Sequence, residues 1–143
     1  MPYRFIDNIA IADAAFEATG STLEEVLLSA WDATLKTMVE NPGSIEMKSS
    51  RSISIIQGQP DLLLHDFLQK LIFYKDAEGE ILRVKALELM RKNNLYQIRA
   101  QLSGEPIDPS RHQMSVDVKA VTFHRLAVVE LESGWSATVV LDV

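Results

Sequence analysis

Two aspartates near opposite ends of the chain, Asp13 and Asp142, stand in contexts that favour oxygen-ligand chemistry. Asp13 lies in the apolar run of residues 9–15, where a carboxylate must be paired, bind a metal or face water at a strand end. Asp142 follows the apolar segment 135–141 and precedes the terminal carboxylate of Val143. We expect this segment to dock in a sheet and hold two adjacent anionic groups, which suit a hard cation. From the local sequence alone, a solvated Asp13 and an exposed acidic tail are the commoner alternatives.

A lysine and a histidine, Lys119 and His124, lie in the apolar segment 118–124. Lys119 could neutralise nearby carboxylates or meet a phosphate of a partner, and His124 could titrate near neutral pH or bind a metal. A lysine with its amine in water and a hydrogen-bonded strand-end histidine are the commoner roles. On a regular strand, Lys119 shares a face with Phe123 and not with His124.

The composition excludes several other kinds of site. The 143 residues include no cysteine, so disulfides, thiol catalysis and cysteine-based metal sites are excluded. With 14 Lys and Arg against 20 Asp and Glu, the formal charge of −6 argues against nucleic-acid binding through charge alone. The sequence has no Gly-rich phosphate loop, no His-Glu-x-x-His pair and no Gly-x-Ser-x-Gly elbow.

The hydropathy pattern predicts a soluble cytoplasmic protein. No apolar run approaches the roughly 18 residues that cross a bilayer, and the first five residues lack the layout of a signal peptide. The hydrophobic share of 47% and the length of 143 residues predict one domain, residues 1–143, with a core of its own.

The clearest predicted element is a helix over residues 21–40. Its apolar residues recur at steps of three and four, and Thr22 with Glu25, or Ser21 with Glu24, forms a capping box at its start. The Asn-Pro-Gly sequence at 41–43 stops it.

A second helix is predicted from residue 59 or 60 to about residue 75. Pro60 suits the first helical position and Asp61 complements the positive end of the helix. Residues 76–79 are then expected to form a turn.

Elsewhere apolar and polar residues alternate with the period of a strand. The predicted strands cover residues 12–18, 45–48, 52–55, 80–92, 95–102, 115–124, 126–132 and 135–143. A hairpin turn is expected at 92–94, and a loop at 104–110. Strands with two segregated helices predict an α+β fold, in which the helices pack on a largely antiparallel sheet.

Taken together, these segments resemble the archease family. The matching residues are Ala12-Asp13, the run Gly20-Ser21-Thr22-Leu23-Glu24-Glu25, Gly104-Glu105 with Arg111-His112, the block 118–124 and the terminal Val140-Leu141-Asp142-Val143. The block 118–124 and the acidic terminus are the specific parts, and the resemblance covers essentially the whole chain.

The resemblance implies a function that the residues alone do not. Archeases activate the GTP-dependent ligase that joins RNA ends in tRNA splicing and RNA repair. The resemblance implies a divalent-cation site formed by Asp13, Asp142 and Val143, whose oxygen ligands suit calcium, manganese or magnesium. Lys119 and His124 would correspond to residues important for activation. The protein would then contact RNA only indirectly, through the ligase.

The chain departs from the family at one place. Many archeases carry His-Thr-Ala-Asp where this sequence has Ala10-Ile11-Ala12-Asp13, so an imidazole and a hydroxyl are missing while the carboxylate is kept. The apolar pair is expected to make the site less polar.

Two other functions remain as alternatives to an accessory, non-enzymatic role. One is a metal-dependent phosphoester hydrolase that uses Asp13, Asp142 and His124, although no general base is evident. The other is a general protein chaperone, although the sequence shows no large apolar stripe for client binding.

Overall fold

The computed structural model describes residues 2–7 and 13–143. In chain order its elements are β1 (Tyr3–Ile6), β2 (Asp13–Gly20), α1 (Leu23–Met38), the short 3-10 helix η1 (Pro42–Ser44), β3 (Ser49–Gln57), α2 (Pro60–Glu78), β4 (Glu80–Lys92), β5 (Leu95–Pro106), β6 (Ala120–Val121), β7 (Ala127–Leu131) and β8 (Gly134–Asp142).

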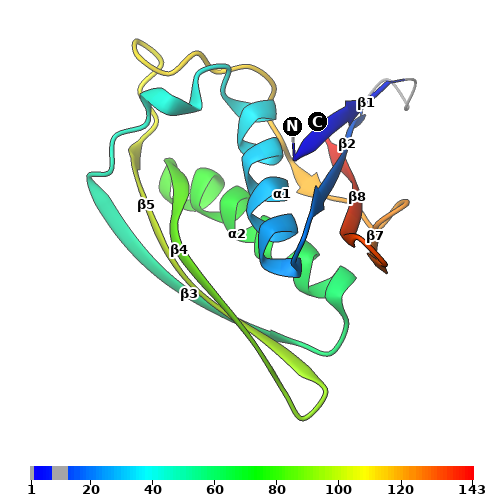
Figure 1. Ribbon diagram of the computed structural model, residues 1–143. Coiled ribbons are helices and arrows are strands. Elements are labelled where there is room, and N and C mark those ends of the chain that lie inside the picture. Colours follow the sequence, from blue (N-terminus) through cyan, green and yellow to red (C-terminus); the bar gives the residue numbers. More distant parts are fainter. Residues whose placement is uncertain (1, 8–12) are drawn as a thin grey trace.

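These strands form two antiparallel sheets with the helices between them (Figure 1). One sheet has the order β1-β2-β8-β6, with β7 paired to the same edge of β8 as β6; the other has the order β3-β5-β4. Helix α1 packs on β2, β8 and β4, and α2 packs on β4, β3 and β6. The predicted α+β class is therefore confirmed, and the strands are divided between two sheets.

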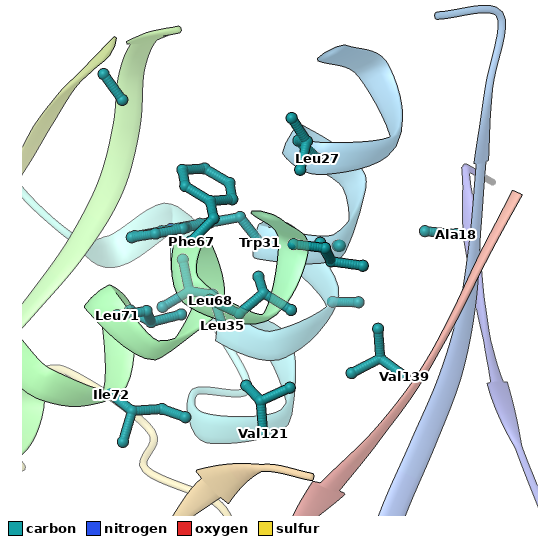
Figure 2. Packing of buried hydrophobic residues seen from close by; sticks show 14 of the residues in the cluster. Ala18, Leu27, Trp31, Leu35, Phe67, Leu68, Leu71, Ile72, Val121 and Val139 are labelled. Atoms are coloured by element: carbon teal, nitrogen blue, oxygen red, sulfur yellow. The ribbon is translucent and has the colours of Figure 1, made fainter. Parts of the chain in front are cut away.

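The core lies where the helices meet, between the two sheets (Figure 2). The rings of Trp31 on α1 and Phe67 on α2 lie 4.9 Å apart, and both side chains are fully buried. The indole Nε1 of Trp31 donates a hydrogen bond to the carbonyl oxygen of Leu82 (3.1 Å), which ties α1 to β4. The polar atom of the largest core residue is thus satisfied inside the core.

Helix α1 begins as its capping residues predict. The hydroxyl of Thr22 accepts from the amide of Glu25 (3.2 Å), and the carboxylate of Glu25 accepts from the amide of Ser21 (2.6 Å). Both bonds satisfy amides that the first turn cannot use.

Helix α2 begins at Pro60 as predicted but is longer than expected. Residues 76–78 remain helical, so the turn expected at 76–79 is wrong for all but its last residue. Gly79 ends the helix with a φ of +63°, and its amide donates to the carbonyl oxygen of Lys75. A left-handed glycine is the usual stop at this position, and it decided the boundary here.

The β4–β5 hairpin confirms the strand predicted over 80–92. Asn93 and Asn94 both have positive φ, at 54° and 63°, which is the geometry of a two-residue type I′ turn. The loop expected at 104–110 is wrong for its first three residues, because β5 continues to Pro106. At Gly104 the strand approaches β4 so closely that a Cβ would overlap the carbonyl oxygen of Ile81.

Two predicted strands are largely wrong. Residues 45–48 are not in a strand, and of residues 115–124 only Ala120 and Val121 are. The amides of Ser115 and Val116 donate instead to the last turn of α1, at the carbonyl oxygens of Met38 (2.8 Å) and Thr37 (3.3 Å). These backbone groups form their hydrogen bonds with a helix and not with a neighbouring strand. The alternation of apolar and polar residues in the sequence does not reveal this difference. The strand β1 was not predicted.

The substitution Gly104→Ala is expected to destabilise the protein by about 3 kcal/mol, because the added methyl group overlaps backbone that cannot move aside. Urea unfolding of the two proteins measures the difference. Gly43→Ala is the matched control, since a Cβ at Gly43 has no atom within 4 Å. Equal stability of the two variants would contradict the close approach of β4 and β5.

Candidate functional site

Asp13 and Asp142, from opposite ends of the sequence, lie directly across from each other on neighbouring strands. Asp13 is the first residue of β2, Asp142 is the last residue of β8, and the antiparallel register pairs them. In Figure 1, β8 (red) runs beside β2 (blue). Residues paired in this way have Cβ atoms about 5 Å apart.

The two aspartates share the face of the sheet that points away from the helices. Side chains alternate along a strand, and Phe16 and Val139, which are also paired, belong to the core beneath α1. Asp13 and Asp142 have the opposite parity, and both are partly buried. Two carboxylates therefore face the same space across one ladder.

This pairing is unfavourable for stability without a counter-charge, since like charges directly opposite one another destabilise a sheet. In residues 2–7 and 13–143, no salt bridge and no side-chain hydrogen bond engages either carboxylate. Within the same residues there is no cluster of three or more His, Cys, Asp or Glu side chains that could hold a metal. A cation there would need a further ligand of another kind, and Val143 adjoins Asp142. The donor set of oxygens fits a hard cation.

The end of the chain is held on both sides, as expected for a docked terminal strand. The carbonyl oxygen of Asp142 accepts from the amide of Lys119 (2.8 Å), and that of Val140 accepts from both the amide and the hydroxyl of Thr122 (3.0 Å each). The side chain of Val143 is partly buried against the core. The carboxylate of Asp142 is therefore attached to backbone that neighbouring segments hold on both sides of the strand.

Lys119 and His124 lie near this strand end, but their side chains make no bond to the carboxylates of the two aspartates in the described part of the chain. Both side chains are exposed. Lys119 precedes β6, and His124 lies in a turn whose next residue, Arg125, has a φ of +57°. Since the strand covers only two residues, the predicted alternation of faces between Lys119 and His124 does not apply. No hydrogen bond or ion pair of the described part of the chain links either side chain to Asp13 or Asp142.

Two side chains of α2 hold the segment that carries Lys119 and His124. These side chains were not connected with that segment in the sequence analysis. Nε2 of His65 donates to the carbonyl oxygen of Val121 (3.0 Å), and the amide of Val121 donates to Oε1 of Gln69 (2.6 Å). The ring of Phe123 stacks on that of His65, with centroids 4.3 Å apart. The spacing of four residues between His65 and Gln69 was the available signal, because it places them on one helix face.

The Gly104-Glu105 and Arg111-His112 motifs meet in a second cluster, buried beneath the loop after β5. The carboxylate of Glu105 accepts from the amide of Glu46 (2.6 Å), from Nε2 of His112 (3.0 Å) and from Arg111. These donors, the Glu46 amide foremost, lower the pKa of Glu105 to about 2. Nδ1 of His112 accepts from the amide of Asp108 (2.9 Å), so the imidazole proton lies on Nε2. The cluster ties the loop to the sheet.

Sequence comparison identifies the family of this chain. The family model described as "Archease protein family (MTH1598/TM1083)" matches residues 3–143. The chain belongs to the archease family. Protein archease of Methanopyrus kandleri is 31% identical over 142 residues, 99% of each chain, and that of Pyrococcus furiosus is 31% identical over 133 residues, covering 92% of this chain and 93% of the relative.

Two solved structures resemble this archease along its length. The solution structure of Methanobacterium thermoautotrophicum protein 1598 has a TM-score of 0.83 and 29% identity, and covers 99% of both chains. The crystal structure of an archease from Thermotoga maritima, described as a possible chaperone, has a TM-score of 0.66 and 18% identity, covers 98% of both chains, and shows the fold alone.

The membrane prediction and the departure from the family motif are addressed only in part by the structure. In the described part of this archease, neither α-helix is long and apolar enough to cross a membrane. Ala10 and Ile11, where the chain departs from the family motif, lie outside the described residues.

The substitution Glu105→Gln is expected to lower the melting temperature at pH 7. Because folding lowers this pKa, ionised Glu105 stabilises the fold above the pKa of an unfolded glutamate, about 4.3. That contribution is lost as the pH falls toward 2, so the two melting curves should converge between these values. Melting temperatures measured from pH 7 to pH 2 test this, with the exposed Glu88→Gln as control. A gap independent of pH would contradict it.

The substitution His65→Ala is expected to speed hydrogen exchange of the amides in residues 119–124 about tenfold, the effect of losing one hydrogen bond of roughly 1.4 kcal/mol. Amides of the β2–β8 ladder should exchange at the unaltered rate. Exchange measured by NMR tests this, with His124→Ala as the control because its ring is exposed. Equal rates in the two variants would remove His65 from this role.

Proposed function

We propose that this archease is an accessory protein that activates a GTP-dependent RNA ligase of tRNA splicing and RNA repair, and that a divalent cation bound at Asp13 and Asp142 takes part. The single observation that carries the cation site is the direct pairing of these two aspartates across the β2–β8 ladder. Family membership supports the accessory role, because that is the function the archease resemblance implies.

The chain's own residues would hold the cation through oxygen alone. Asp13 and Asp142 supply side-chain carboxylates from paired strand ends, and Val143 supplies its main-chain carboxylate beside them. Calcium accepts such ligands in irregular and bidentate arrangements, while manganese and magnesium use the same oxygens with stricter geometry. When bound, the cation would neutralise the like charges and offer a coordination position to a carboxylate or phosphate of the ligase.

Lys119 and His124 would make the contacts next to the cation. Both side chains are exposed on the segment that pairs with the end of β8, and His65 and Gln69 fix that segment from α2. A lysine amine suits a phosphate or carboxylate of the partner, and a histidine can donate or accept at neutral pH. An activator of this kind needs only to bind one state of its target better than another.

A general chaperone is the second candidate, favoured by the description of the Thermotoga maritima archease as a possible chaperone. The exposed large apolar side chains of the described residues lie on different elements, for example Phe5 on β1, Phe73 on α2 and Leu131 on β7. Protection of unrelated unfolded proteins from aggregation would support this role over ligase activation.

The substitution Asp13→Asn is expected to make the protein more stable than the wild type without a cation and less stable than the wild type when a cation is bound. Without one, removing a like charge should stabilise the protein by about 0.5 kcal/mol. With millimolar calcium or manganese, the wild-type melting temperature should rise and that of the variant should not. Asp142→Asn should behave alike, and Glu132→Gln, an exposed turn residue, should behave as wild type. An equal rise in all four proteins would exclude the proposed site.

The same variants test activation. Ligation of RNA ends by a slow ligase should speed up when the wild-type protein is added, and the aspartate variants should lose this effect while remaining folded. Deleting Val143 should also reduce activation, since it moves the terminal carboxylate. Unchanged ligation with wild-type protein, with no complex formed, would overturn the accessory role; hydrolysis of phosphoesters that is lost in Asp13→Asn would favour a hydrolase instead.

A further inference from the structure

The strand β3 leaves one edge of the three-stranded sheet open. Its only ladder in the described part of the chain is with β5, and the backbone of residues 50–57 makes no backbone hydrogen bond outside that ladder. In an antiparallel pair, every second residue points its N–H and C=O away from the partner. About four residues of β3 therefore direct their backbone N–H and C=O groups to this edge. The guanidinium of Arg51 donates to the carbonyl oxygen of Ser50 (3.3 Å) at the start of the strand.

This edge lacks the features that usually block strand addition. The sequence of β3 contains no proline and one charged residue, Arg51, which is engaged with Glu80 at 2.7 Å. Its register with β5 is continuous over all nine residues, without a bulge. Proteins commonly protect open edges with lysine, proline or bulges.

A groove runs between this edge and one face of α2. It has a volume of about 510 Å³ and is bounded on one side by residues 54–56 of β3. The other side is formed by Asp66, Gln69, Lys70 and Phe73, whose spacing places them on a single stripe of the helix. A strand edge beside a helix is the arrangement that binds extended peptides by strand addition.

The groove's side chains define what such a strand should contain. Phe73 and Ile56 are more than half exposed, at 53% and 58%, and offer apolar contacts. Asp66 already accepts from Nε2 of Gln57 (2.9 Å) and lies near His65. Lys70 makes no salt bridge within the described residues, so its charge is available to a ligand.

We propose that the β3–α2 groove, formed by residues 54–56 together with Asp66, Gln69, Lys70 and Phe73, binds an extended segment of a partner protein as an added strand. Backbone hydrogen bonds to β3 hold the segment. Its side chains on the helix side place an apolar residue against Phe73 and an acidic residue, two positions away, against Lys70. The site lies on the sheet that does not contain Asp13 and Asp142, and it shares Gln69 with the contacts that hold Val121.

A short peptide of sequence Thr-Val-Thr-Glu-Thr-Val-Thr, blocked at both ends, is the probe. Adding it to the full chain should slow hydrogen exchange at alternate amides of residues 50–57 and shift the NMR signals of Lys70 and Phe73. The peptide with lysine in place of glutamate should bind about fivefold more weakly, the scale of an exposed ion pair. A peptide with a central proline should not bind, because it cannot complete the ladder.

Variants of the groove residues make the test specific. Lys70→Glu should reverse the preference, so that the lysine peptide binds more tightly than the glutamate peptide. Phe73→Ala should weaken both by about fivefold. Lys85→Glu, an exposed lysine on β4 at the opposite edge, is the matched control and should leave binding unchanged.

Three results would overturn the proposal. One is no protection of β3 amides at millimolar peptide, and another is an equal effect of Lys70→Glu and Lys85→Glu. The third is a protein that is dimeric without peptide and already protected at alternate β3 amides, which would assign the edge to a second copy of the chain.

Discussion

The pairing of β2 with β8 is the constraint on which the candidate site depends. It joins the early part of the chain to its end over eight residue pairs, and its last pair sets Asp13 against Asp142. A sheet with one buried face fixes this register strongly, because a slip of one residue would turn Phe16 and Val139 out of the core. Packing on the core face therefore fixes the register of the two strands. That register in turn places the two carboxylates opposite each other on the face away from the core.

The strand β8 is paired along both of its edges up to Asp142. Strand β8 pairs with β2 on one side and with β6 and β7 on the other. Two side chains of α2 then bind both backbone groups of Val121 in β6. The backbone of β8 that carries Asp142 is therefore fixed along both of its edges.

The two sheets present different kinds of surface. The five-stranded sheet carries the acidic strand ends, and the exposed Lys119 and His124 lie next to its strand β6. The three-stranded sheet continues past the helices in its β4–β5 hairpin (Figure 1) and leaves the edge of β3 open. Because the helices lie between the sheets, the acidic strand ends and the open edge of β3 lie on different sheets.

The sequence alone determined the features that depend on neighbouring residues. The capping box of α1, the start of α2 at Pro60 and the turn at Asn93 and Asn94 follow from residue type and spacing, since the interactions that decide them are local. Asp13 and Asp142 could also be singled out, because acidic residues in apolar segments have few stable environments.

Only the tertiary structure decided what depends on distant contacts. It replaced most of the strand expected over 115–124 with irregular backbone, bonded to α1 and β8. It brought His65 and Gln69 to Val121, more than 50 residues away along the chain. It also set the β2–β8 register that places the two aspartates face to face. A strand's partner and register depend on the packing of the whole core, and alternation in a single segment carries no information about either.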